Sequence, residues 1–196
     1  RAEKGLNKAN SLWFWGAGTR PALENFTEKT GRRGAMISAV DLLKGIAIGA
    51  GMQVIKVPGA TGGLHTNYRG KAMAAVQALT EGGNDFVYVH VEAPDEMGHQ
   101  GSCERKIESI EYLDEQVIRP VYEELTARGI DFRMLVMPDH PTPIRVRTHT
   151  ADPVPYLLYD SCEALGCHAA YDEAEGAASG LLLREGFRIA DLLFSV

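Results

Sequence analysis

Short apolar runs alternate with helical patterns along most of the 196-residue chain, and this alternation limits the possible folds more than any other feature. The clearest apolar run is residues 86–91 (FVYVHV), and residues 132–137 form a second one. Strands and helices that alternate in this way are typical of a mostly parallel sheet covered by helices on both faces. The sequence therefore predicts an α/β fold with three layers, α/β/α. Strands are expected at 12–15, 35–38, 52–57, 86–91, 132–137 and 154–159, and helices at 21–29, 41–50, 71–79, 104–127 and 187–194.

The longest helix is expected at residues 104–127, because its apolar side chains recur every three or four positions and so share one face. Pro120 lies inside this pattern and should kink the helix, since proline lacks a backbone N–H and crowds the preceding turn. Gly129 is suited to end it. The residues of the apolar face are Ile107, Ile110, Leu113, Val117, Val121 and Leu125.

Composition narrows the classes of partner. The 26 acidic side chains outnumber the 20 basic ones, and a formal net charge of −6 argues against nucleic acid as a main partner. The sequence has no apolar run near the roughly 20 residues that a membrane span needs. The three cysteines form no CxxC pair, which favours a reducing compartment and hence the cytoplasm. Oligomeric state does not follow from the sequence.

Potential metal ligands follow the two clearest strands. Asp95 and His99 come after residues 86–91, Asp139 and His140 come after residues 132–137, and His149 lies in the next loop. In a parallel sheet these strand ends share one edge, so the five side chains should converge there. Two carboxylates and three imidazoles suit Mn²⁺ or Zn²⁺. Because five ligands exceed the needs of one catalytic ion, we expect a site for two divalent ions.

Each of these motifs has a simpler interpretation when it is taken alone. A single DxxxH segment is more often an ordinary surface loop, and His90, inside a strand, is expected to be a core residue. The glycine-rich stretches 15–21 and 57–63 match neither the dinucleotide fingerprint nor a P-loop, so turns are their simplest explanation. A phosphate or substrate could still meet backbone amides near 57–63, beside Thr61, Asn67 and Lys71. The role of His65 stays open.

Five longer runs together resemble one family. The runs are NKANSLWFWGAGTRPAL (7–23), VPGATGGLHTNYRGKA (57–72), DFVYVHVEAPDEMGHQG (85–101), KIESIEYLD (106–114) and PDHPTPIRVRTHTADPVPYLLYD (138–160). They are similar to the archaeal type of cofactor-independent (2,3-bisphosphoglycerate-independent) phosphoglycerate mutase, a branch of the alkaline phosphatase superfamily. This resemblance extends over nearly the whole chain.

The resemblance implies an alkaline phosphatase-like fold with two divalent ions, usually manganese. By their motifs, Asp95, His99 and His149 would hold one ion, and Asp139 and His140 the other. Family members interconvert 2-phosphoglycerate and 3-phosphoglycerate through a phosphoserine, so the implied partner is a small phosphorylated metabolite. None of the serines in this chain lies in the nucleophile motif, and family chains are about twice as long. Residues 1–196 are therefore expected to be the C-terminal part of the catalytic domain, inactive without the N-terminal part.

Two departures from the family pattern bear on the substrate. Glu92-Ala93-Pro94 precedes the first ligand motif where many mutases have a lysine, and Pro141-Thr142 stands where Ser-Thr is commoner. These variants resemble a bacterial subgroup that is also labelled probable homoserine kinase. The substrate-binding candidates are Lys71, Asn67, Arg145 and Arg147. A homoserine-type kinase, a phosphomonoester hydrolase of the same superfamily and a metal-binding module kept for structure are the alternative functions.

Overall fold

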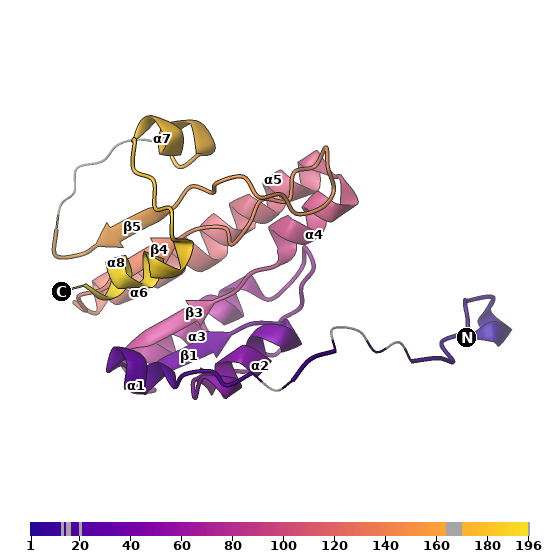
Figure 1. Ribbon diagram of the computed structural model, residues 1–196, viewed down its shortest axis with the longest axis horizontal. Coiled ribbons are helices and arrows are strands. Elements are labelled where there is room, and N and C mark those ends of the chain that lie inside the picture. Colours follow the sequence, from indigo (N-terminus) through magenta and orange to yellow (C-terminus); the bar gives the residue numbers. More distant parts are fainter. Residues whose placement is uncertain (13, 15–16, 20, 164–169, 196) are drawn as a thin grey trace.

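Three strands form a parallel sheet in the lower part of Figure 1, where the helices labelled α1, α2 and α3 lie around it. The computed structural model describes the whole chain except residues 13, 15–16, 20, 164–169 and 196. The strands are β1 (Gly34–Ile37), β2 (Gln53–Val54) and β3 (Phe86–Val89), in the order β2-β1-β3. Gly34 to Ile37 pair in register with Phe86 to Val89, and both pairings of β1 are parallel. The predicted α/β class with a parallel sheet is confirmed.

Helices α2 (Asp41–Gly49) and α3 (Tyr68–Thr80) connect these strands and pack against them. All four residues of β1 are buried, which explains why this strand is a short continuous run of small and apolar side chains. Tyr68 and Ala72 of α3 belong to a core cluster with Ala93 and Val117. The core therefore joins α3 to segments that follow β3.

The predicted long helix is present, but it is interrupted. It comprises α5 (Cys103–Leu113), a π-helical turn η2 (Asp114–Ile118) and α6 (Arg119–Ala127), with Pro120 in the first turn of α6. The irregularity thus comes one turn before Pro120, where the wider π turn relieves the crowding that the ring would cause in a regular helix. In Figure 1 the three pieces form one rod. Helix α6 packs against α3, and its Tyr122 ring also contacts the rings of Phe132 and Tyr159.

The last two strands depart from the prediction. β4 (Arg133–Val136) and β5 (Leu157–Asp160) pair antiparallel with each other and, among the described residues, form a sheet separate from β1–β3. β5 starts three residues later than expected because Pro153 and Pro155 cannot donate to a strand ladder. Arg133 Nε donates to Asp160 Oδ2 at 2.5 Å across the pair. Among the described residues, the predicted mostly parallel sheet is thus formed by β1–β3, and β4 and β5 lie outside it.

The termini also differ from the expectations. Leu12 and Phe14 are exposed and not in a strand, and the rest of the expected strand 12–15 lies outside the described residues. The helix expected at 21–29 is only α1 (Phe26–Thr30), because the Asn25 side chain accepts the N–H groups of Thr27 and Glu28 and so starts the helix there.

The remaining helices are short. They are α4 (Ala93–Gln100), α7 (Glu173–Ala178), α8 (Ile189–Phe194) and the 3-10 turns η1 (Ala2–Lys4) and η3 (Gly186–Arg188). The ring of Phe194 in α8 packs edge-on against Phe26 and Phe86, which fixes the C-terminal helix beside α1 and β3. Within the described ranges, every helix is too short or too polar to cross a membrane.

Candidate metal centre

Helix α4 carries the first two candidate ligands on one face. It starts shortly after β3 and has Pro94 in its first turn. Asp95 and Glu96 lie near its N-terminus, where negative charge interacts favourably with the helix dipole. Asp95 and His99 are four residues apart, so their side chains lie one above the other. Asp95 Oδ2 is 3.3 Å from His99 Nε2. The sequence interpretation treated this segment as a loop, although proline followed by acidic residues is a helix-start signal.

His149 completes a group of three converging ligands. Its Nε2 atom is 3.3 Å from Asp95 Oδ1 and 3.2 Å from His99 Nε2. One ligand atom from each of the three side chains lies within 4.8 Å of the other two. Ligand atoms that bind one ion through bonds of about 2.0–2.2 Å are roughly 3 to 3.5 Å apart from one another. The spacings between these three side chains therefore fit one shared divalent ion. The chemistry and spacing of the three groups thus fit the implied metal.

Asp139 and His140 lie next to this group. The rings of His140 and His149 are 3.7 Å apart between centroids and tilted by 30°. Asp139 contacts His140 twice, through His140 N–H to Oδ1 at 3.1 Å and through Nε2 to Oδ2 at 3.5 Å. The structure therefore brings all five predicted residues into one cluster, although β4 is not part of the parallel sheet. Their binding of two ions stays a prediction.

Two backbone features orient His99. Its Nδ1 atom lies 2.9 Å from the carbonyl oxygen of Arg147, so Nδ1 carries the proton and, in the neutral ring, Nε2 keeps its lone pair toward Asp95 and His149. Arg147 has φ of 59°, in the left-handed region that non-glycine residues seldom adopt. Its own N–H donates to Pro143 at 2.8 Å, which holds this turn in place. The strained residue thus presents its carbonyl group to a candidate ligand.

The four predicted substrate-binding residues have different environments. Asn67 caps α3, with its amide oxygen accepting from Gly70 N–H and its amide nitrogen donating to Pro58. Lys71 is fully buried, and its ammonium group donates to the His90 carbonyl at 2.9 Å. Arg145 and Arg147 are exposed in the loop that carries the histidines. Asn67 and Lys71 thus make structural contacts, whereas the two arginines are exposed in the loop that also carries His140 and His149.

Charges at the start of α4 influence one another. The pKa of Glu92 is raised by burial and by the neighbouring carboxylates Glu96 and Asp95, and Lys71 opposes this shift. Burial lowers the pKa of Lys71, and Glu92 partly offsets that effect. The raised pKa means that the charged form of Glu92 is disfavoured at this position.

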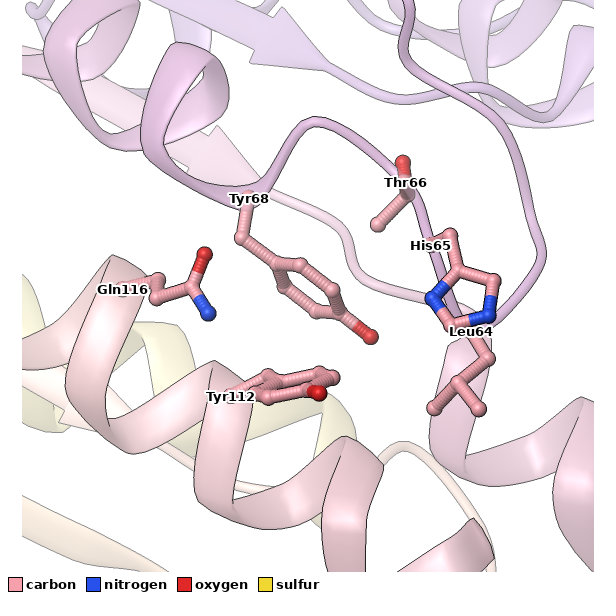
Figure 2. A pocket seen from close by; sticks show the side chains of 6 residues that line it. All are labelled: Leu64, His65, Thr66, Tyr68, Tyr112 and Gln116. Atoms are coloured by element: carbon pink, nitrogen blue, oxygen red, sulfur yellow. The ribbon is translucent and has the colours of Figure 1, made fainter.

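His65, whose role the sequence left open, lies in a separate cavity. Figure 2 shows Tyr68 and Tyr112 facing each other there, with His65 at the other end. The cavity has a volume of about 230 Å³ and lies between the loop before α3 and the π turn. The Tyr68 hydroxyl group is buried and has no hydrogen-bond partner among the described residues. Burial, Tyr112 and Glu108 raise the Tyr68 pKa to about 12, so the phenol stays neutral.

Comparison with known families decides the relationship. Residues 2–182 match the family described as the metalloenzyme superfamily. The chain belongs to the metalloenzyme superfamily. Among curated proteins, it is 51% identical over 180 residues to the 2,3-bisphosphoglycerate-independent phosphoglycerate mutase of Methanosarcina acetivorans, a match that covers 92% of this chain and 45% of the relative. It is 47% identical over 195 residues to a probable enzyme of the same name from Geobacter sulfurreducens, covering 98% of this chain and 48% of the relative.

Two solved structures resemble this metalloenzyme chain. A Pyrococcus horikoshii protein aligns with a TM-score of 0.78 and 31% identity, over 87% of this chain and 50% of its own. The cofactor-independent phosphoglycerate mutase of Thermoplasma acidophilum aligns with a TM-score of 0.60 and 28% identity, over 88% of this chain and 39% of its own. The chain thus spans about half the length, or less, of the relatives that it matches.

Proposed function

We propose that this metalloenzyme chain binds divalent metal ions and contributes them to phosphoryl transfer. The observation that carries the proposal is the convergence of Asp95, His99 and His149, whose ligand atoms lie within 4.8 Å of one another. Asp139 and His140, stacked beside His149, are the proposed ligands of a second ion. Bound divalent ions would supply charge neutralisation to a phosphoryl group and lower the pKa of an attacking hydroxyl group. Mn²⁺ is the proposed ion, and Zn²⁺, Mg²⁺ or Co²⁺ are alternatives.

The residues of this chain have separate roles in the proposal. His99 is held by the Arg147 carbonyl, so its Nε2 lone pair faces the site without a reorganisation on binding. Arg145 and Arg147 are exposed in the loop that carries His140 and His149, and we propose that their guanidinium groups bind phosphate or carboxylate oxygens of the substrate. Lys71 already donates to a main-chain carbonyl group, so we assign it a supporting role behind Glu92.

We propose that the substrate is a small phosphorylated metabolite and that the complete enzyme interconverts 2-phosphoglycerate and 3-phosphoglycerate. The names of the Methanosarcina and Geobacter relatives support this choice. Since the chain spans about half of those relatives, we further propose that it is the C-terminal part of an alkaline phosphatase-like domain. The serine that carries the phosphoryl group would then come from the remaining part, and this chain alone would not turn over substrate.

A chimera tests the proposal. The part of the Methanosarcina acetivorans enzyme that matches this chain is replaced by this chain, and conversion of 3-phosphoglycerate is followed by ³¹P NMR. We expect activity that needs Mn²⁺ and that disappears in Asp95→Asn, and no activity from this chain alone. Metal-independent turnover, or turnover by the isolated chain, would contradict the proposal.

The same experiment separates the alternatives. Appearance of 2-phosphoglycerate with conserved organic phosphate indicates transfer, whereas release of inorganic phosphate indicates a hydrolase of the same superfamily. For the homoserine-type kinase, the names of the relatives described above offer no support. Phosphorylation of homoserine by the chimera in the presence of ATP would nevertheless restore that alternative.

A further inference from the structure

Thr142 connects the two groups of candidate ligands. It is 4% exposed, and its hydroxyl group donates a short hydrogen bond to Asp95 Oδ1. The Thr142 hydroxyl oxygen also lies 3.3 Å from His140 Nδ1. Because the hydroxyl proton is directed to Asp95, the oxygen can only accept from His140, which places the His140 proton on Nδ1. One hydroxyl group thereby fixes a carboxylate of α4 and the ring of a loop histidine, and it leaves the His140 Nε2 lone pair available.

Lys106 holds Thr142 from the other side. Its Nζ atom donates to the Thr142 carbonyl oxygen at 2.7 Å, and the side chain is only partly exposed. The approach is close because Gly98 has no side chain. A Cβ atom there would lie 3.0 Å from Thr142 Cγ2 and 3.1 Å from Lys106 Nζ. Lys106 in α5 and Gly98 in α4 thus clamp residue 142 of the loop between two helices.

We propose that Thr142 and Lys106 are positioning residues that hold the loop 138–150 against α4 and so set the arrangement of the metal ligands. The loop provides His140 and His149, and α4 provides Asp95 and His99. The ligands therefore converge only when the loop is held in its observed position against α4. The inference rests on the metal-binding role proposed above. It adds two residues that do not contact the ions but determine how strongly the ions bind.

The test measures metal binding by the chain with three matched variants. Thr142→Val removes the hydroxyl group at nearly constant size, Thr142→Ser keeps it, and Thr148→Val makes the same change at an exposed position of the same loop. We expect the Kd for Mn²⁺, measured by titration calorimetry, to rise about 10–100-fold in Thr142→Val and to stay near the original value in the other two. The visible absorption spectrum of the Co²⁺-loaded chain should change only in Thr142→Val, since it reports ligand geometry. An unchanged Kd and spectrum in Thr142→Val would overturn the proposal.

Lys106→Met provides an independent test if Thr142→Val does not fold, because it keeps the apolar part of the side chain and removes only the donor. We expect a weaker effect in the same direction, and a wild-type Kd in this variant would count against the clamp. Hydrogen exchange in the metal-free chain gives a second readout. The N–H groups of Arg147 and Thr150 bond within the loop, to Pro143 and Pro141, and should exchange at least about tenfold faster in Thr142→Val.

This second readout separates the two proposals. If the unmodified chain bound no Mn²⁺, the proposed function would be wrong. Faster exchange in Thr142→Val would then still support the clamp, and unchanged exchange would refute it as well.

Discussion

Gly98→Ala is the sharpest perturbation of the contact between α4 and the loop 138–150. Gly98 is inside α4, so helix propensity alone predicts that alanine would stabilise the protein by up to about 1 kcal/mol. The new Cβ atom, however, would lie closer than 3.0 Å to the Thr142 carbonyl oxygen, which is a backbone atom held by Lys106. Overpacking of this kind typically costs about 1–3 kcal/mol. The net expectation is a loss of up to about 2 kcal/mol.

Gly45→Ala is the matched control. Gly45 is also inside a helix, α2, but a Cβ atom there would meet no atom within 4 Å. Alanine should therefore stabilise the protein by about 0.5–1 kcal/mol. Urea unfolding of both variants compares their free energies of unfolding, and we expect Gly98→Ala to be about 1–3 kcal/mol less stable than Gly45→Ala. At this chain length the difference corresponds to roughly 2–12 °C in Tm.

The result that would refute this reasoning is equally specific. If Gly98→Ala were as stable as Gly45→Ala and bound Mn²⁺ with the original Kd, the close packing of Thr142 on α4 would contribute neither to the free energy of unfolding nor to metal binding. A loss of stability with an unchanged Kd would limit the contact to a structural role. We expect both quantities to change, because the displaced loop carries His140 and His149.

Three further predictions follow from single interactions. Tyr68→Phe should leave the free energy of unfolding unchanged or raise it by up to about 1–2 kcal/mol in urea titrations, because the buried hydroxyl group has no partner among the described residues. A clear loss of stability would show that the hydroxyl group is bonded. The Arg133 hydrogen bond, followed by the Cys162 N–H, lowers the Asp160 pKa, so its stabilisation is complete above the unfolded pKa and is lost as pH falls through the lower folded pKa. Asp160→Asn should therefore unfold more readily at pH 7 and lose less stability on acidification, and identical pH profiles would contradict this. Mn²⁺ at 100 times its Kd should stabilise the chain by about 2.7 kcal/mol, seen as a higher Tm that EDTA reverses. A Tm that does not respond to Mn²⁺ would count against binding to the folded state.

The sequence predicted the parallel part of the fold well because each signal there was local. Residues 86–91 and 41–50 closely match β3 and α2, since a continuous apolar run and a helical period each depend on neighbouring residues. The antiparallel pairing of β4 and β5 was missed. The direction of β5 relative to β4 depends on the course of the loop 138–156 that connects them. No pattern of neighbouring residues indicates that course.

In the candidate site, too, features with a local sequence signal were predicted and features that depend on tertiary packing were not. Asp95 and His99 were identifiable by their position after β3, and so were Asp139 and His140 after β4, because potential ligands that follow strands are visible in a sequence. Thr142 and Lys106 were not identified, because a threonine in a proline-rich loop and a lysine in a helix are ordinary residues by themselves. Their contacts become visible only in the structure, through the hydrogen bonds of Thr142 and Lys106 and the close packing at Gly98. Likewise, the burial of Lys71 could not be read from its position in an alanine-rich helix.

Metal titration of the unmodified chain and of three histidine variants tests the central claim most directly. His99→Ala and His149→Ala remove proposed ligands, and His65→Ala removes an exposed histidine that lines a different cavity. Calorimetric titration with Mn²⁺ should give saturable binding to the unmodified chain and to His65→Ala, and a Kd at least about tenfold higher in the two ligand variants. Binding that is absent from the unmodified chain, or equally strong in all four proteins, would contradict the assignment of this cluster as a metal centre.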